Sequence, residues 1–237
     1  MISVCIATYN GEKFIKVQLD SILSQLDTED EVIIVDDASK DNTVKIINSI
    51  NDFRLKIFQN NFNLGFVKTF EKAIKMSSGD IIFFSDQDDY WLDNRVEIMS
   101  KALTESKKYL IISQFTTSQL QGILQNSIAN DINLTRYFTL TSIFFGGSLY
   151  FGSTMCIDRR LLNYILPFRF YVKAHDLHIA IIAILLNKCH VIEDVLTIRT
   201  LTGLNLTNPN RSILNKISSR FSYLTSLIFH LPLRFLK

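Results

Sequence analysis

The chain has 237 residues, and its 25 basic and 23 acidic side chains leave a formal net charge of only +2. This balance argues against a dedicated nucleic-acid-binding protein, and 47% apolar with 20% charged residues argues against wholesale disorder. The three cysteines, Cys5, Cys156 and Cys189, are far apart, which argues against a disulfide framework or structural zinc module and fits a reducing compartment.

Apolar or β-branched runs alternate with helical periodicity through the first half of the chain. We expect strands over residues 3–7, 31–35, 55–58 and 80–84 and helices over 15–26, 41–50, 66–74 and 92–101. This alternation predicts an α/β protein with a mostly parallel, doubly wound sheet flanked by helices.

The second half is less regular. Residues 114–135 are rich in Gln, Asn and Ser and are expected to form a long loop or lid. After it we expect a strand over 154–157, a strand over 191–199, and helices over 136–145, 158–166, 175–186 and 211–229.

No targeting or membrane-spanning segment is expected. The N-terminus lacks a basic region before its short apolar run, and the uncharged stretch 137–157 contains many Ser, Thr and Gly residues. A soluble or peripheral cytoplasmic protein is therefore the default expectation.

Polar clusters follow three of the expected strands. They occupy residues 8–11, 36–39 and 85–89. Because the carboxyl ends of parallel strands share one edge of a sheet, where ligands of such sheets bind, the three clusters should converge there.

The third cluster contains Asp86, Asp88 and Asp89. Carboxylates packed this closely raise one another's pKa unless a cation neutralises them, and a hard divalent cation, Mg²⁺ or Mn²⁺, suits an oxygen-only site. Alternatively, Asp89 and Asp93 cap the expected helix over 92–101, although capping requires neither Asp86 nor three acids together.

The second cluster offers a similar choice. A carboxylate of Asp36 or Asp37 could accept a base N–H or a ribose hydroxyl, whereas Asp41 could simply cap the next helix. The glycine-rich phosphate loops of nicotinamide-binding and P-loop proteins are absent from the sequence, so carboxylates and a metal would have to hold a nucleotide here.

Four segments occur in a characteristic order: VCIATYNG (4–11), IVDDASKDNT (34–43), NFNLG (61–65) and GDIIFFSDQDDYW (79–91). Together they resemble the family 2 glycosyltransferases of bacterial surface polysaccharide synthesis, especially the rhamnosyltransferase-like branch, in which Ser-Asp-Gln-Asp-Asp-x-Trp is common. The resemblance is strong over residues 1–105 and traceable to about residue 206.

The resemblance implies a GT-A fold and inverting transfer of a sugar from a dTDP-, UDP- or GDP-sugar to a growing, lipid-linked glycan. Thr8, Tyr9, Asp37 and Asp86 match positions that hold the nucleoside. Asp88 matches the metal-binding acid of the DxD motif, with Asp86 and Asp89 nearby, and the metal would neutralise the diphosphate leaving group.

The family pattern also places a catalytic base after a small-residue-rich segment. Residues 146–155 form such a segment, so Asp176 is the candidate base, with His175 beside it. From the residues alone, capping of the apolar helix that follows is the favoured role of Asp176 and His175, and only the resemblance favours the base.

Residues 198–205 resemble the family's Tyr-Arg-x-His-x-x-Asn element. Arg199 would bind the diphosphate, and Asn205 stands at the matching position. Ile198 and Thr202 replace the common Tyr and His, so either activity is reduced or another residue substitutes for them.

The roles of two further groups of residues stay open between a ligand-binding and a structural interpretation. His175, His178, Cys189 and His190 could approach one another around zinc, but their spacing matches no standard zinc module, and core or capping roles are favoured. Tyr90 and Trp91 could stack on a sugar ring, or Trp91 could simply be buried.

The charge is unevenly distributed. Residues 195–237 contain six basic and no acidic residues, which leaves 19 basic and 23 acidic residues in the rest. We expect a glycosyltransferase domain over 1–206 and a basic amphipathic helical extension over 207–237, which either packs on the domain or contacts the inner membrane face.

Two competing functions were weighed against the glycosyltransferase. A sugar-1-phosphate nucleotidyltransferase would also use an α/β nucleotide-binding sheet, but residues 8–11 lack the glycine-rich, arginine-containing loop expected of one. A non-catalytic nucleotide- or glycan-binding module is the other alternative, motivated by the altered segment around Arg199.

Overall fold

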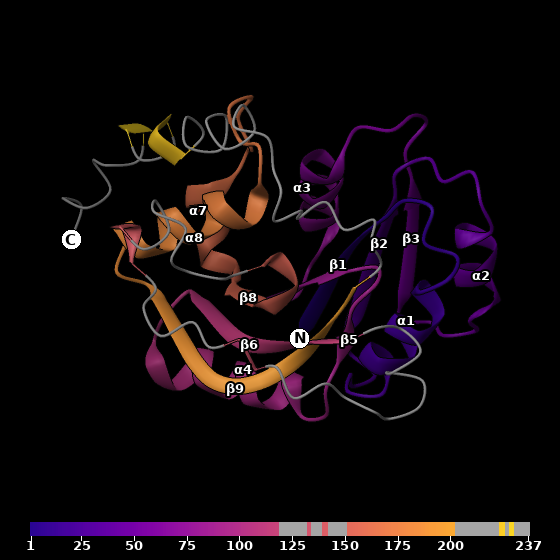
Figure 1. Cartoon of the computed structure of the whole chain (residues 1–237), viewed down its shortest axis with the longest axis horizontal. Helices are drawn as coiled ribbons and strands as arrows, with labels where there is room; N and C mark the ends of the chain where they lie inside the picture. Colours follow the sequence, from indigo (N-terminus) through magenta and orange to yellow (C-terminus); the bar gives the residue numbers. More distant parts are fainter. Residues whose placement is uncertain (119–131, 134–138, 142–150, 202–222, 226–227, 230–237) are drawn as a thin grey trace.

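The computed structural model describes residues 1–118, 132–133, 139–141, 151–201, 223–225 and 228–229. Its centre is a nine-stranded sheet with the strand order β3-β2-β1-β4-β8-β6-β9-β5, and β7 pairs with β6 off this path (Figure 1). The α/β class expected from the sequence is confirmed.

The first half of the sheet is parallel, as the alternation of strands and helices predicts. Strands β1 (Ile2–Thr8), β2 (Glu31–Asp36), β3 (Leu55–Gln59) and β4 (Ile81–Asp86) pair in parallel. Helices α1 (Ile15–Leu23), α2 (Thr43–Ser49) and α3 (Phe66–Met76) connect them.

The second half of the sheet is mixed. Strand β8 (Met155–Asp158) is antiparallel to both β4 and β6 (Leu110–Ser118), and β9 (Cys189–Thr200) is parallel to β6. The short strands β5 (Tyr90–Trp91) and β7 (Ile132–Asn133) add antiparallel pairs with β9 and β6. Residue periodicity predicts a strand but not its direction. The expected mostly parallel arrangement therefore describes the first half of the sheet better than the whole sheet.

Helix α4 (Arg95–Ser106) ends the first half of the chain. The second half contains the 3₁₀ turns η1 (Gly152–Thr154) and η2 (Arg159–Leu161), and helices α7 (Leu162–Ile165) and α8 (His175–Leu185). The expected strand at 154–157 and helices at 158–166 and 175–186 are thus confirmed to within a few residues.

One expectation about the second half is wrong. Residues 114–118 form the end of β6 rather than the start of a loop, because their polar side chains find partners inside the sheet. Gln114 is 2% exposed, and its side-chain amide donates to the carbonyl of Ile192 at 2.9 Å. The rest of the expected lid, 119–131 and 134–135, lies outside the described residues.

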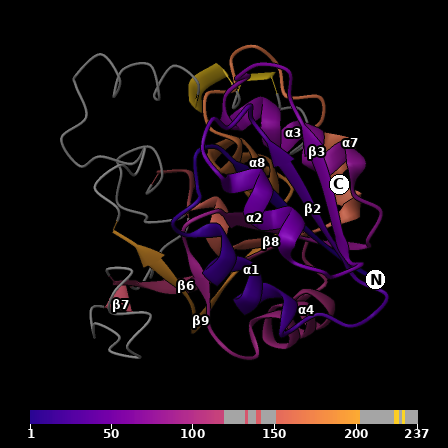
Figure 2. The same cartoon turned by 90° about the vertical axis from the view of Figure 1, so that its right-hand side faces the viewer.

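Helices cover both faces of the sheet (Figure 2). On one face α3, α7 and α8 pack on alternate strand residues such as Cys5, Ile33 and Phe84. On the other face α1, α2 and α4 pack on the intervening residues, such as Ile6, Ile34 and Phe83. Period-two alternation of buried residues therefore gives the sheet two apolar cores.

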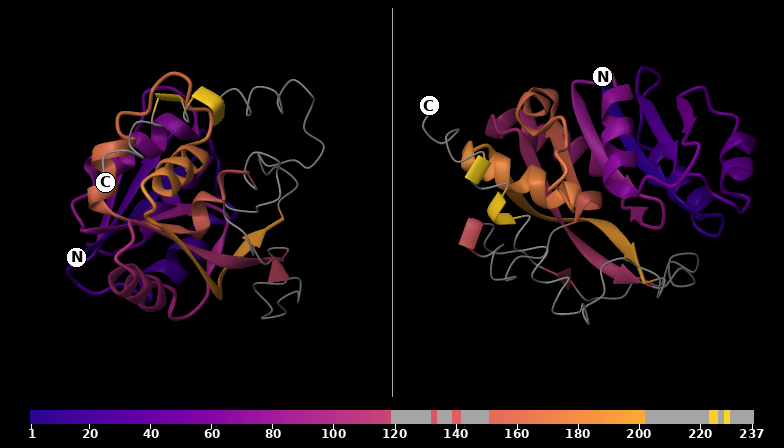
Figure 3. Two further views of the ribbon diagram at one scale, coloured as in Figure 1. Left: turned by 90° about the vertical axis from the view of Figure 1, so that its left-hand side faces the viewer. Right: turned by 90° about the horizontal axis from the view of Figure 1, so that it is seen from above.

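The C-terminal extension is described only in part. Tyr223 is 4% exposed and donates its hydroxyl to the carbonyl of Leu140 at 2.7 Å, and the Phe229 ring stacks on Tyr171 at 5.3 Å. Figure 3 shows these short C-terminal pieces, in yellow, beside the orange segment around α7 and α8. Most of the expected helices over 136–145 and 211–229 lies outside the described residues.

Within the part of the chain that the structure describes, no helix combines the length and apolar character needed to cross a membrane.

Candidate active site

The polar clusters after the parallel strands meet at one edge of the sheet. In the strand register Thr8 lies opposite Asp36, and Ala7 lies opposite Asp86. The convergence expected from the sequence is confirmed, because β1 lies between β2 and β4.

The loops after β1 and β4 are joined directly. Gln87 accepts a hydrogen bond from the backbone N–H of Tyr9 at 2.9 Å and donates one to the Tyr9 carbonyl at 3.1 Å. A Cβ atom at Gly11 would lie 2.3 Å from the side-chain carbonyl oxygen of Gln87, so a larger residue there would displace this amide. Tyr9 itself is 43% exposed at the rim of the site.

The two neighbouring aspartates after β2 organise the loops around them. Asp36 accepts hydrogen bonds from the Thr8 hydroxyl at 3.0 Å and from the backbone N–H of Ser39 at 2.9 Å. Asp37 accepts from the Asn60 side chain and from the backbone N–H of Leu64 and Gly65, each at 2.8 Å, which fixes the loop after β3. Asp37 thus shapes the wall of the site, and most of its acceptor positions are already used.

The three acids after β4 share one electrostatic environment. Burial raises the pKa of Asp86 well above its usual range, as do the charges of Asp89, Asp88 and Asp176, while Arg199 lowers it. Burial and Asp89 raise the pKa of Asp88 to about 7, against the effects of its own backbone N–H and Arg199. The structure therefore brings Asp86, Asp88 and Asp89 together near Arg199, and places Asp176 near Asp86.

Asp89 has no structural partner that explains its burial. It is 3% exposed, and neither carboxylate oxygen accepts a hydrogen bond from a described residue. Burial raises its pKa, although Arg199, the Ser153 hydroxyl, the Thr200 backbone and Arg95 lie near enough to lower it. The capping interpretation is wrong for Asp89, because α4 begins only at Arg95 and Asn94 occupies its N-cap position.

Trp91 belongs to the core beneath these acids. It is 1% exposed, and its ring lies 4.6 Å from the guanidinium carbon of Arg95. Of the two interpretations of Trp91, burial is the one that fits, because its face is not available to a sugar ring.

Arg95 is a buried cation that the sequence analysis did not single out. It donates to the hydroxyl of Thr197 and, at 2.7 Å, to the carbonyl of Ser153, and it is completely buried. It therefore joins α4, β9 and η1 behind the acid cluster. Burial lowers its pKa to about 10, and the charges of Cys156 and Asp89 partly oppose that effect.

Arg199 reaches the acid cluster from β9. The pairing of Tyr90 with Ile198 in β5 and β9, carried one residue further, sets Arg199 opposite Asp89. The Arg199 guanidinium carbon lies 3.5 Å from the ring centroid of Phe151, and its Nε is buried without a hydrogen-bond partner among the described residues. Asn205, the other residue predicted from this element, lies outside the described residues.

Asp176 lies in the first turn of α8, close enough to raise the pKa of Asp86. Its carboxylate accepts a hydrogen bond from the backbone N–H of Leu177 at 2.7 Å, while Ala174 occupies the N-cap position. Asp176 is thus half-buried near Asp86.

His175 points into the core instead of toward a ligand. Its ring stacks on Phe70 at 4.1 Å, and neither ring nitrogen has a hydrogen-bond partner among the described residues. Burial lowers its pKa, opposed by the charge of Asp176. A Cβ atom at Gly152 would lie 2.7 Å from the His175 Nε2, so this histidine fixes the distance between α8 and η1.

The described residues contain no group of three or more His, Cys, Asp or Glu side chains arranged around a common metal position. His175 and His178 are 4% and 2% exposed and pack against the rings of Phe70 and Phe168, which fits the core role favoured for them. Mg²⁺ needs only one or two protein carboxylates when substrate phosphates and water complete its shell. Asp88 with Asp86 or Asp89 fits that requirement, and the unpartnered oxygens of Asp89 are free to take part.

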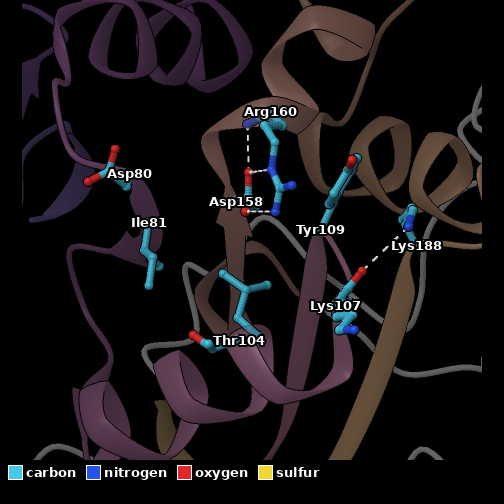
Figure 4. Close-up of a pocket in the computed structure, with 9 residues that line it drawn as sticks. Asp80, Ile81, Thr104, Lys107, Tyr109, Asp158, Arg160 and Lys188 are labelled. Carbon is cyan, nitrogen blue, oxygen red and sulfur yellow. Dashed lines mark hydrogen bonds and ion pairs between the residues drawn. The ribbon is translucent and has the colours of Figure 1, made fainter.

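A pocket of about 530 Å³ lies at the other end of β4, away from the acids (Figure 4). It is lined by Asp80, Tyr109, Asp158, Arg160 and Lys188, among others. Arg160 is paired there with Asp158, to which it donates at 2.6 Å, and the Lys188 ammonium donates to the Lys107 carbonyl at 3.5 Å. It is separate from the candidate active site.

Several residues of the site were not predicted. Arg95, Gln87, Asn60, Phe151 and Ser153 all contact predicted site residues or support the loops that carry them. Gln87 lies inside the Ser-Asp-Gln-Asp-Asp segment, and Phe151 and Ser153 lie inside the small-residue-rich segment 146–155, but neither segment distinguishes these side chains from their neighbours.

Comparison with known proteins agrees with this geometry. The model of the family described as "Glycosyl transferase family 2" matches residues 3–164. The Escherichia coli protein "UDP-Glc:alpha-D-GlcNAc-diphosphoundecaprenol beta-1,3-glucosyltransferase WfaP" is 34% identical over 115 residues, covering 48% of this chain and 46% of the relative. The Shigella flexneri "dTDP-rhamnosyl transferase RfbG" is 38% identical over 99 residues, covering 38% of this chain and 34% of the relative. The matched segments span less than half of each relative.

Solved structures share the fold. The S. aureus TarS 1-349 crystal structure in complex with UDP-GlcNAc aligns with a TM-score of 0.69 at 21% identity, covering 98% of this chain and 73% of that one. The mannosyltransferase PcManGT of Pyrobaculum calidifontis, in complex with GDP-Man and Mn²⁺, aligns with a TM-score of 0.65 at 17% identity, covering 99% and 73%. The expected GT-A fold is confirmed, and the chain belongs to glycosyl transferase family 2.

Proposed function

We propose that this protein transfers a sugar from a nucleotide-diphosphate donor to a hydroxyl group of a surface-polysaccharide acceptor, with inversion at the anomeric carbon. The observation that carries the proposal is the unmatched charge at the carboxyl edge of the sheet. Asp89 is buried without a hydrogen bond, and Arg199 lies near it without an ion pair to a described residue. A metal-bound diphosphate would supply positive charge to the acids and negative charge to the arginine.

The donor is a UDP-, dTDP- or GDP-sugar. The names of relatives and structural neighbours mention UDP-Glc, dTDP-rhamnosyl transfer, UDP-GlcNAc and GDP-Man. Thr8, Tyr9, Asp37 and Asp86 would hold its nucleoside at the junction of β1, β2 and β4. The exposed Tyr9 ring is free to stack on the base, while Asp37 fixes the loop that borders it.

The metal is Mg²⁺ or Mn²⁺, held by Asp88 with help from Asp86 and Asp89. When bound, it would neutralise the diphosphate as the bond to the sugar breaks. Arg199 would bind the same diphosphate from the β9 side, because its guanidinium already faces the acids.

Asp176 would act as the base. It lies near Asp86 but on a different element, at the start of α8. From there its carboxylate would take the proton of the acceptor hydroxyl as that oxygen attacks the anomeric carbon from the side opposite the diphosphate. A single displacement of this kind inverts the configuration.

The acceptor is a growing glycan linked to a lipid at the cytoplasmic membrane face. The name of the WfaP relative specifies a diphosphoundecaprenol acceptor. The six basic and no acidic residues of 195–237 would favour an anionic membrane surface, and Leu224, Ile228 and Phe229 are exposed. The choice of sugar, with rhamnose as one candidate, is left to the experiment.

Calorimetric titration of the purified protein with UDP-, dTDP- and GDP-sugars in the presence of Mn²⁺ tests this function. We expect one nucleotide class to bind and to be hydrolysed slowly without an acceptor. Asp88→Asn should abolish the Mn²⁺-dependent part of the binding, whereas Asp158→Asn, at the other end of the sheet, should leave it unchanged. Binding of no nucleotide sugar would refute the proposal, and release of inorganic diphosphate from a sugar 1-phosphate and a nucleoside triphosphate would identify a nucleotidyltransferase instead.

A further inference from the structure

Arg199 is held by an aromatic ring instead of by hydrogen bonds. Its guanidinium carbon lies 3.5 Å from the Phe151 ring centroid and 5.9 Å from that of Phe115. No hydrogen bond or ion pair joins it to any other residue that the structure describes. No described residue therefore uses the donors of the Arg199 guanidinium.

The Phe151 ring is itself firmly placed. Its carbonyl accepts hydrogen bonds from the Thr154 backbone N–H at 3.0 Å and from the Thr154 hydroxyl at 2.8 Å. The edge of its ring meets the ring of Phe115 at 5.1 Å and an interplanar angle of 88°. Phe115 is 4% exposed in β6, so the chain of contacts ends in the core.

The Phe151 ring matters for the Arg199 guanidinium because the neighbouring residue of β9 does not hold it. Ile198, the preceding residue of β9, is 1% exposed and has no polar group to offer. Successive side chains of a strand point to opposite faces, so Ile198 faces the core while Arg199 faces the acids. Without the ring, the long Arg199 side chain would sample many rotamers and would lose that freedom on binding a phosphate.

We propose that Phe151 is a positioning residue that holds the Arg199 guanidinium in place to receive the distal phosphate of the nucleoside diphosphate. This inference rests on the proposed function and deepens it. The ring acts through the cation–π attraction and touches no reacting atom.

The test compares binding of a nucleoside diphosphate with binding of its monophosphate. UDP, dTDP and GDP are titrated with Mn²⁺ into the wild-type protein by calorimetry, and the tightest binder and its monophosphate are carried forward. Phe151→Leu should weaken binding of the diphosphate roughly 3- to 30-fold, the range that loss of one cation–π contact gives, and leave the monophosphate unchanged. Phe151→Tyr keeps the aromatic face and should restore binding.

A matched control exists at the opposite edge of the sheet. The Tyr109 ring lies 4.7 Å from the guanidinium carbon of Arg160, an equivalent contact just before β6 (Figure 4). Tyr109→Leu should therefore leave the affinity for both nucleotides unchanged. In the Arg199→Met background, Phe151→Leu should cause no further loss, because the cation that the ring supports is gone.

Three results would overturn the inference while leaving the proposed function standing. They are full diphosphate affinity in Phe151→Leu, equal losses for the monophosphate and the diphosphate, and a loss that persists in the Arg199→Met background. Because each variant must still bind the monophosphate, a misfolded variant is recognised within the same titration. If the wild-type protein binds none of the three diphosphates, the proposed function fails and this inference fails with it.

Discussion

The buried carboxylates near the two ends of strand β4 differ in their hydrogen bonding. Near its start, the buried carboxylate of Glu31 accepts hydrogen bonds from the Ser3 hydroxyl and the Lys56 ammonium at 2.6 Å, and from Ser78. Near its end, the buried carboxylate of Asp89 accepts none from a described residue. Both acids are almost fully buried, so burial alone does not separate them.

The difference lies in what surrounds each carboxylate. At Glu31 burial opposes ionisation, but the hydrogen bonds from Lys56, Ser3 and Ser78 outweigh it and lower the pKa to about 2. At Asp88 burial and the neighbouring Asp89 act together and raise the pKa to about 7. A matched charge, one with hydrogen-bond or ion-pair partners in the protein, stabilises a fold. An unmatched charge, one without such partners, destabilises the fold and is expected where a ligand supplies the missing partner. The comparison thus identifies the functional end of the sheet without reference to relatives.

The largest effect is expected at the functional end, from Asp176→Asn. If Asp176 is the base, the rate of sugar transfer at saturating substrates should fall by about 10²- to 10⁴-fold. Donor affinity should not change, because the residue does not contact the nucleotide in our proposal. Transfer assays with a defined acceptor, alongside calorimetry with the donor, measure the two quantities, and undiminished transfer would show that another group takes the proton.

At the matched end, Glu31→Gln should cost stability instead of activity. The amide nitrogen cannot accept from Lys56, Ser3 or Ser78, and hydrogen bonds to a charged group contribute most of what is lost. We expect the free energy of unfolding in urea to fall by about 3 kcal/mol. Nucleotide affinity of the folded variant should equal that of the wild type; a specific loss of affinity would mean that the two ends are coupled.

Asp88→Asn should change the free energy of unfolding of the metal-free protein in the opposite direction to Glu31→Gln. Removing one of several repelling, partly buried carboxylates should raise the free energy of unfolding by about 1 kcal/mol, while Mn²⁺-dependent nucleotide binding disappears. Thermal unfolding with and without Mn²⁺ separates the two effects. A destabilised Asp88→Asn variant would contradict the view that this carboxylate is unmatched.

The pH dependence of stability should also differ in sign between the two ends. The folded-state pKa of Asp88, about 7, lies above its ordinary value of 3.8, so the folded protein binds this proton more tightly and gains stability as the pH falls from 8 toward 5. The pKa of Glu31 lies below its ordinary value of 4.5, so its contribution is complete above pH 4.5 and is lost as the pH falls toward 2. Urea unfolding of the metal-free protein should therefore show a stability maximum near pH 5. Asp88→Asn should weaken the dependence of stability on pH only above that maximum.

The sequence could predict the first half of the fold because each strand and helix there has its own periodicity. It could also predict where Asp86, Asp88 and Asp89 meet Thr8 and Asp36, since parallel strand ends must share an edge. The same reasoning failed for Gln114, whose polar side chain looked like part of a loop but is paired inside β6.

The supporting residues of the site could not be predicted in this way. Arg95 reaches Ser153 across 58 residues of sequence and Thr197 across 102. Phe151 meets Arg199 only because β6, β9 and η1 pack together. Their roles arise from tertiary packing, which leaves no local pattern, whereas the acids form a pattern because they are neighbours in the chain.

The smallest effect is expected from Arg160→Ala at the matched end. Arg160 bonds to Asp158 through two nitrogens, at 2.8 and 2.6 Å, but its side chain is 64% exposed. Water replaces most of what such a pair contributes, so the free energy of unfolding should fall by less than about 1 kcal/mol. Nucleotide affinity should stay the same, although Arg160 lines a pocket of about 530 Å³ at that edge. A loss of nucleotide binding in this variant would show that matched charge does not exclude a functional role. The difference between the two ends of β4 would then no longer identify the functional end of the sheet.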